Sequence, residues 1–207
     1  MKIIGLTGGI ATGKSTVSKM LVERGFEVID ADAVVKELQV AGSPLLTEIT
    51  KAFGSTTLGE DGNLKRAELA KIIFMDEEAR NELNAIVHPV VRAEFERRIA
   101  RSQAEILFLD VPLLFETGFS DMTDANLVIN ASESTQYKRL KQRDGLTRNE
   151  IYARIRSQMS LSEKTEWADY VIDNDGDFRE LEEQVEKFLG GMTNERDSHS
   201  GSTVVQD

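Results

Sequence analysis

The sequence predicts an α/β fold, a three-layer sandwich in which helices cover both faces of a parallel sheet. Short apolar segments alternate along the chain with segments of helical periodicity, which is the order of parallel strands joined by crossover helices. The first apolar segment runs directly into residues 8–15, GGIATGKS, which match the phosphate-binding pattern G-x-x-x-x-G-K-[ST] in full. A strand, a glycine-rich loop and a helix in this order predict the P-loop NTPase fold.

Five apolar segments are the predicted strands, at residues 3–6, 27–29, 106–109, 127–129 and 170–172. The third is apolar throughout, which is typical of a central strand that is buried on both faces. Helical periodicity is clearest at residues 15–24 and 178–189. We therefore assign a nucleotide-binding core to residues 1–31, 105–133 and 167–190.

The glycine-rich loop builds an anion site from its own backbone. Its N–H groups turn inward, the helix that follows adds positive potential, and Gly8 and Gly13 allow backbone angles that a Cβ would oppose. The pattern predicts that Lys14 reaches the β- and γ-phosphates of ATP and that the Ser15 hydroxyl holds Mg²⁺.

A long gap between the second and third strands predicts a helical insertion, residues 32–104, which we expect to bind the substrate. Its predicted helices are residues 44–53, 66–74 and 76–101. Asp76 is a candidate N-cap, with acidic residues in the first turn that follows. Pro89 should kink or split the last helix near His88, because proline removes a backbone donor and clashes with the preceding turn.

A second insertion, residues 134–166, is rich in basic side chains. They are Lys138, Arg139, Lys141, Arg143, Arg148, Arg154 and Arg156. The capping-box spacing of Thr147 and Glu150 predicts a new helix after a turn at Asp144-Gly145, so two basic helices would form a movable lid. The alternative is a solvated helical face with no further role. Residues 191–207 are polar and without periodicity, which predicts a disordered tail.

Composition limits the possible functions. The 207 residues carry a net charge of −11, no cysteine and two histidines, which rules out disulfides and thiolate chemistry and argues against a histidine-built zinc site. The acidic balance argues against nucleic acid as a partner, although not against a small anionic substrate. With no secretory signal and no apolar stretch long enough to span a bilayer, we expect a cytoplasmic protein with no membrane partner.

Carboxylates follow two of the predicted strands. In an open parallel sheet, ligands gather beyond the carboxyl ends of the strands, where Asp30 and Asp32 follow the second strand and Asp110 ends the third. Asp32 could accept the proton of an attacking hydroxyl, and Asp30 could orient waters on Mg²⁺. The alternative is that Asp30 or Asp32 caps the next helix, and both readings can hold together. Asp110 has the Walker B form, an acid after four apolar residues that accepts hydrogen bonds from water on the metal.

Three other side chains admit structural explanations. A histidine before a proline, as at His88, is more often a structural hydrogen-bonding group than a catalytic one. Trp167 and Phe119 are expected to pack rather than to stack on a base.

Short motifs also follow one another along the chain in order. They are GLTGGI (5–10) running into GKST (13–16), VIDAD (28–32), DGNLKR (61–66), IVHP (86–89), DVPLLFE (110–116), Arg139 through Arg143 and Asp144, and ADYVIDN (168–174). In this combination, the chain resembles the dephospho-coenzyme A kinase family over roughly residues 1–190. The resemblance implies phosphorylation of the ribose 3′-hydroxyl of dephospho-CoA by ATP with Mg²⁺, the last step of coenzyme A biosynthesis.

The resemblance also implies roles for single residues. Asp32 is the implied base, and Arg143 comes from the lid. Arg139 and Asn174 would flank the adenine, and Arg66 and His88 would lie near the substrate in the coenzyme A-binding insertion. The ATP phosphates would be gripped by Ala11, Thr12, Gly13, Lys14, Ser15 and Thr16. At Ala11-Thr12 many relatives have Gly-Ser, a departure that these wild-card positions tolerate.

Three other functions are possible for a chain with this loop. Another small-metabolite or nucleoside monophosphate kinase would share the loop, the insertion and the lid. A regulatory GTPase would need a guanine-selecting Asn/Thr-Lys-x-Asp motif, which the sequence lacks. A non-catalytic ATP-binding module would be favoured by the loss of Lys14, Asp32 or the lid arginines, and all are present. For the oligomeric state we favour a monomer.

Overall fold

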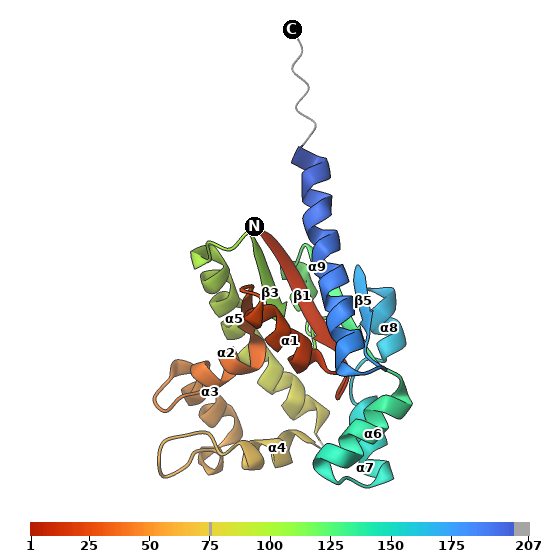
Figure 1. Cartoon of the computed structure of the whole chain (residues 1–207). Coiled ribbons are helices and arrows are strands. Elements are labelled where there is room, and N and C mark those ends of the chain that lie inside the picture. The colour runs from red at the N-terminus through yellow and green to blue at the C-terminus, as the bar shows by residue number, and fades with distance from the viewer. Residues whose placement is uncertain (75, 201–207) are drawn as a thin grey trace.

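A five-stranded, all-parallel sheet forms the centre of the molecule, in the order β2-β3-β1-β4-β5 (Figure 1). The computed structural model describes residues 1–74 and 76–200, with residues 193–200 described for the backbone alone. The strands are β1 (Lys2–Gly8), β2 (Glu27–Asp30), β3 (Ile106–Asp110), β4 (Ala125–Asn130) and β5 (Tyr170–Asp173). All five predicted strands are confirmed.

Alternating side chains of β3 show why the fold has three layers. Ile106 and Phe108 belong to one hydrophobic cluster, and Leu107 and Leu109 belong to another on the opposite face. Successive residues of a strand point to opposite faces, so a strand that is apolar throughout needs cover on both sides. Burial of each such side chain contributes roughly 1.5–3 kcal/mol.

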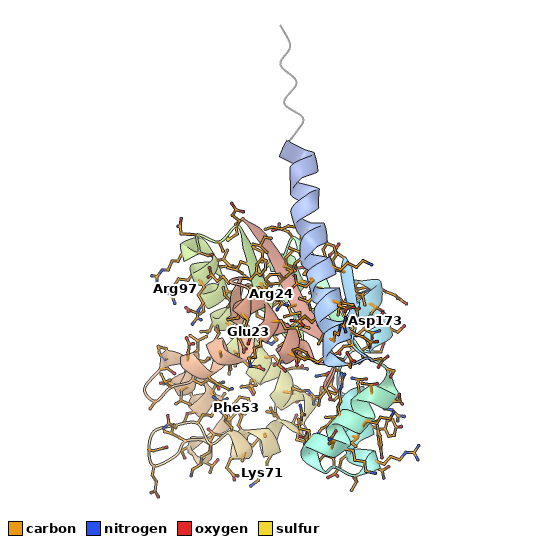
Figure 2. The ribbon with its side chains drawn as sticks, in the orientation of Figure 1. Glu23, Arg24, Phe53, Lys71, Arg97 and Asp173 are labelled. Carbon is orange, nitrogen blue, oxygen red and sulfur yellow. The ribbon has the colours of Figure 1, made fainter. Side chains whose placement is uncertain are left out.

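Helices supply that cover on each face (Figure 1). The first cluster is completed by α1 (Lys14–Glu23) and α9 (Phe178–Ser200), and the second by α2 (Ala31–Leu38) and α5 (Glu77–Arg101). At the end of α1, Arg24 is bonded to Glu182 at 3.2 Å and to Glu186 at 2.6 Å, which ties α1 to α9 (Figure 2).

Helix α9 is longer than the sequence predicts. It continues through Gly190 to Ser200, where a disordered tail was expected from residue 191 onward. Once a helix is nucleated, each further residue adds a hydrogen bond at little extra cost, and no proline interrupts this stretch. The remainder of the predicted tail, residues 201–207, lies outside the described residues.

The helical insertion contains α2, α3 (Pro44–Phe53), a 3₁₀ turn η1 (Ser55–Thr57), α4 (Arg66–Phe74) and α5. Leu45, Ile49 and Leu69 form a small core of its own. Asp76 caps α5 by accepting a hydrogen bond from Ala79 N at 3.0 Å, as predicted.

Pro89 does not split α5, contrary to the prediction that allowed a break near His88. The helix is continuous from Glu77 to Arg101. Val91 and Phe95 follow Pro89 and are 3% and 0% exposed, so packing against the sheet holds the helix together across the missing hydrogen bond.

The basic insertion folds as α6 (Glu133–Asp144), α7 (Arg148–Arg156) and α8 (Leu161–Glu166). The predicted turn between the first two helices is confirmed, because Gly145 adopts the left-handed conformation with φ 65° after the end of α6. The predicted capping box of Thr147 and Glu150 is also present. A third helix, α8, was not predicted.

Figure 1 places α3 and α4 on one side of the carboxyl end of the sheet and α6 and α7 on the other. A short 3₁₀ turn, η2 (Phe119–Met122), follows β3. Among the described residues, no helix has the length and apolar character needed to cross a lipid bilayer.

Candidate active site

A cavity of about 760 Å³ opens beyond the carboxyl ends of the strands, which is a size typical of small-molecule sites. Most of the predicted nucleotide-binding residues line it: Ala11, Gly13, Lys14, Ser15, Thr16, Asp32, Arg139, Arg143 and Asn174. Four other predicted residues, Asp30, Asp110, Arg66 and His88, are not part of its lining. Thr12, the remaining one, is completely buried behind the loop.

The backbone of the phosphate loop is held in two left-handed conformations. Gly13 has φ 97°, and a Cβ there would lie 2.1 Å from Asn174 Nδ2, so only glycine fits. Ala11 has φ 61°, which a residue with a Cβ adopts at a cost. The hydroxyl of Thr12 donates to Gly9 O at 2.9 Å and closes the loop from inside.

Lys14 and Asp110 form an ion pair behind this loop, in which the ammonium donates to a carboxylate oxygen. Asp110 is only 3% exposed, and burial raises the pKa of its carboxyl while the charge of Lys14 opposes that rise. A cation and an enclosed carboxylate are therefore already paired where a phosphate and its metal ion would be bound.

Asp30 and Asp32 take different positions after β2. The Asp30 carboxylate accepts hydrogen bonds from Asp32 N at 2.8 Å and from Ala33 N at 3.1 Å, so it caps α2. The capping interpretation is thus confirmed for Asp30. Asp32 lies in the first turn of α2, where its exposed side chain lines the cavity.

The residues predicted to hold Mg²⁺ fit that ion. In the register of the sheet Asp30 lies opposite Asp110, and its charge adds to burial in raising the pKa of Asp110. Ser15 is the second residue of α1. Among the described residues no three His, Cys, Asp or Glu side chains gather into a metal cage. Mg²⁺ needs no such cage, because it keeps several waters and uses one or two carboxylates with substrate phosphates.

Arg139 and Asn174 donate hydrogen bonds to backbone carbonyls of the phosphate loop. The Arg139 guanidinium donates to Ala11 O at 3.3 Å, to Thr12 O at 3.2 Å and to Asn174 O at 2.9 Å. Asn174 is 5% exposed and donates to Thr12 O at 2.7 Å. Both side chains therefore bind the loop as well as line the cavity.

Arg143 lines the cavity from the second half of α6 but is paired with its neighbour. Its Nε and Nη2 atoms donate to the two oxygens of Asp144 at 2.8 Å and 3.0 Å. Arg154 Nη1 lies 3.3 Å from the same carboxylate. These cations lower the pKa of Asp144, with the Arg143 hydrogen bond as the largest cause.

Arg66 and His88 lie in the insertion, away from the cavity lining. Arg66 is exposed at the start of α4. His88 is half-buried, with its ring centre 5.9 Å from that of Phe119 in an edge-to-face arrangement, and burial followed by the charge of Arg92 lowers its pKa. The role of both as substrate contacts stays a prediction. Phe119 is 4% exposed and packs in the core, and Trp167, which is 56% exposed, meets Phe115 edge-on.

Four side chains around the loop were not found from the sequence: Gln136, Gln158, Glu116 and Lys164. Gln136 donates to Ile10 O at 2.7 Å, and Gln158 accepts from Ile10 N at 2.8 Å. Lys164 is fully buried against Glu116. Gln136 stands three residues before Arg139 and seven before Arg143, so its place on the same helical face was a usable signal. Glu116 ends the DVPLLFE motif, which by itself predicts no role for it, and no comparable pattern marks Gln158 or Lys164.

A phosphate loop at the carboxyl edge of a parallel 2-3-1-4-5 sheet, with an acid and two arginines of α6 around one cavity, defines a P-loop kinase. The dephospho-CoA kinase family profile matches residues 2–180, and the chain belongs to this family. Members of the family carry out the final step of coenzyme A biosynthesis.

Individual relatives agree with this assignment. The dephospho-CoA kinase of Gloeobacter violaceus is 46% identical over 188 residues, covering 91% of each chain. The solved structure of TT1252 from Thermus thermophilus is similar with a TM-score of 0.80 and 35% identity, over 92% of this chain and 97% of that one. Dephospho-CoA kinase from Campylobacter jejuni gives a TM-score of 0.71 at 28% identity, over 95% and 100%.

Proposed function

We propose that this protein transfers the γ-phosphoryl group of ATP to the ribose 3′-hydroxyl of dephospho-CoA, giving coenzyme A and ADP. The observation that carries the proposal is the single cavity that holds the phosphate loop, Asp32 and Arg143 together. Phosphoryl transfer depends mainly on positioning and on charge stabilisation, and these side chains supply both.

On the ATP side, backbone N–H groups of the loop and the start of α1 receive the phosphates. Lys14 leaves Asp110 and binds the β- and γ-phosphates, which neutralises charge that grows in the transition state. Ser15, Asp30 and Asp110 would hold Mg²⁺, directly or through its waters, and the ion when bound would neutralise negative charge on the phosphates. Arg139 and Asn174 would flank the adenine.

On the acceptor side, Asp32 acts as the base. The ribose 3′-hydroxyl oxygen forms a bond to the γ-phosphorus while its proton moves to the Asp32 carboxylate. The bond between the γ-phosphorus and the β–γ bridging oxygen breaks, and ADP leaves with that electron pair. Arg143 stabilises the charge on the transferring group.

The two insertions complete the site in this proposal. Residues 32–104 would bind the coenzyme A part of the acceptor, with Arg66 and His88 near it, and residues 134–166 would close over the phosphates and exclude water. We propose further that the protein works as a monomer in the cytoplasm, with ATP and dephospho-CoA as its partners.

A coupled assay of ADP release tests this function. ATP is supplied with dephospho-CoA, shikimate, gluconate and nucleoside monophosphates in turn, and we expect a high kcat/KM with dephospho-CoA alone. Asp121→Asn, an exposed acid of η2 outside the cavity lining, serves as the control for variant preparation. A higher kcat/KM with any other acceptor would replace the proposed substrate.

A further inference from the structure

The backbone N–H and C=O of one loop residue, Ile10, are each bonded to a glutamine, and the two glutamines come from opposite ends of the lid segment. Ile10 N donates to Gln158 Oε1 at 2.8 Å, and Ile10 O accepts from Gln136 Nε2 at 2.7 Å. A glutamine amide offers one acceptor and one donor group, and here each glutamine uses a different one. Both backbone groups of Ile10 are thereby occupied by side chains of the lid segment.

Gln136 belongs to a part of α6 that is fixed to the loop. Its side chain is 3% exposed, and a Cβ on Gly9 would lie 2.8 Å from its Nε2 atom. Arg139, in the next turn, donates to two further loop carbonyls, and Leu140 is completely buried. The first two thirds of α6, up to Leu140, are thus part of the wall of the phosphate loop.

The chain that follows Gln158 is bonded to the segment that follows β3. Met159 N donates to Glu116 Oε1 at 3.1 Å, immediately after Gln158 in the chain. Lys164 is 0% exposed and reaches Glu116 Oε1 at 2.9 Å and Pro112 O at 3.0 Å. Thr7 at the end of β1 donates to the same Pro112 carbonyl at 3.0 Å. These contacts anchor residues 158–166 to the central sheet.

The part of the lid segment between these anchors is held differently. We call residues 134–140 and 158–166 the lid base, and residues 141–157 the lid tip. Arg143 and Arg154 in the tip pair with Asp144, which also belongs to the tip. Their side chains are 60% and 51% exposed, so water competes with these ion pairs.

The tip is packed as well, since Ile151 is completely buried and the Tyr152 ring lies 5.8 Å from that of Tyr137 in the base. Among the described residues, however, the side chains of the lid segment that hydrogen-bond to the phosphate loop come from the base and not from the tip. These anchors at both ends of the tip mark where motion begins and ends.

We propose that Gln136 and Gln158 are positioning residues that set the shape of the phosphate loop and confine lid closure to residues 141–157. This inference rests on the proposed kinase function, which supplies the ligands that close the lid. The two peptide groups that flank Ile10 cannot turn while one glutamine holds each of them, so the loop stays open for ATP. Arg143 then travels with the tip, while Arg139 stays on the base.

Hydrogen exchange measured by mass spectrometry tests the boundary in the unaltered protein. We expect peptides of the lid base to exchange slowly with or without ligand, and peptides of the lid tip to slow at least severalfold with Mg²⁺ and a non-hydrolysable ATP analogue plus dephospho-CoA. Ligand-dependent slowing of residues 134–166 as one block would overturn the inference. Exchange in the lid base can also be measured with the ATP analogue alone. The test therefore still applies if dephospho-CoA is not the acceptor.

Two near-isosteric variants, Gln136→Met and Gln158→Met, test the glutamines themselves. Each leaves one backbone group of Ile10 without its partner, so we expect the KM for ATP to rise roughly tenfold while kcat changes by less than about threefold. Exchange in the lid base should become faster and ligand-dependent. Unchanged KM and unchanged base exchange in both variants would refute the positioning role.

The chain offers a matched control for the loss of a glutamine that is bonded to backbone groups. Gln184 on α9 binds both backbone groups of Asp173 by itself, donating to Asp173 O at 2.6 Å and accepting from Asp173 N at 3.1 Å. Asp173 lies at the end of β5, as Figure 2 shows. Gln184→Met should therefore leave exchange in the lid base unchanged. Faster exchange of the lid base in this variant would mean that the loss of any glutamine bonded to the backbone has that effect. Such a result would contradict a specific role for Gln136 and Gln158.

Discussion

Lys14 and Asp110 form an ion pair in which 17% of the lysine side chain and 5% of the aspartate side chain are exposed. The cation assigned to the nucleotide phosphates is therefore also the counter-ion of an enclosed carboxylate. Because a buried charge without a partner is costly, we expect Lys14 to contribute to folding as well as to the proposed catalysis. The two contributions are separable by mutation.

Lys14→Met should lower kcat/KM by the equivalent of roughly 3–4 kcal/mol, because it removes a charge that stabilises the transition state. It should also lower the free energy of unfolding by roughly 1–3 kcal/mol, since Asp110 loses its partner. Burial raises the pKa of Asp110, so the folded state favours the protonated acid, and this loss of stability should grow as the pH rises above the ordinary pKa of aspartate.

Urea unfolding at several pH values and steady-state kinetics measure both effects. The double variant Lys14→Met/Asp110→Asn is the control, because it removes the buried charge and should recover stability without recovering activity. Wild-type activity in Lys14→Met would contradict the assignment of the phosphate loop.

Asp32→Asn should lower kcat about 10²–10⁴-fold, because the amide keeps the shape of the side chain but cannot accept the proton. ATP binding, measured by titration calorimetry, should change little. The stability of α2 should also be kept, since Asp30 rather than Asp32 supplies the cap. A collapse of ATP affinity with a normal kcat would show that Asp32 serves the metal ion instead.

Asp144→Asn should raise kcat/KM by roughly two- to fivefold at low salt, because the pair that Arg143 must leave before reaching the phosphates is weakened. The gain should shrink at high ionic strength, where the pair is screened in both proteins. The measurement is steady-state kinetics at two salt concentrations. A fall in kcat/KM, like that expected for Arg143→Ala, would show that Asp144 presents Arg143 to the phosphates rather than withholding it.

Ala11→Gly should raise the free energy of unfolding by roughly 0.5–1 kcal/mol, because glycine adopts a φ of 61° without the strain of a Cβ. Ala153→Gly in the exposed face of α7 is the matched control and should lower it by a similar amount. The urea midpoints of unfolding of the two variants and of the wild type, compared at an unchanged m-value, measure these changes in stability. Destabilisation by both substitutions would mean that the loop conformation imposes no strain on Ala11.

The sequence predicts the sheet well because its signals are local. A strand such as Ile106–Asp110 is apolar at four successive positions, and the loop after β1 has a fixed spacing of glycines and lysine. Packing was less predictable. The continuity of α5 through Pro89 depends on burial of Val91 and Phe95, which no local pattern records.

The candidate site likewise contains residues that the sequence predicts and residues that it does not. Lys14, Ser15 and Asp32 stand in recognisable motifs, and the structure places all three at one cavity. Gln158 lies 148 residues from its partner Ile10 along the chain, and the burial of Lys164 depends on Glu116 from another element. Such partners meet only after folding, so a single sequence without its structure carries no signal for them.

The position of the phosphate on the product tests the central claim most directly. The protein is incubated with ATP, Mg²⁺ and dephospho-CoA, and the product is analysed by ³¹P and ¹H NMR alongside mass spectrometry. We expect one product, coenzyme A, with the new phosphate coupled to the proton on ribose carbon 3′ and one ADP formed per phosphate transferred. A phosphate on another hydroxyl, or ADP released without a phosphorylated acceptor, would contradict the account.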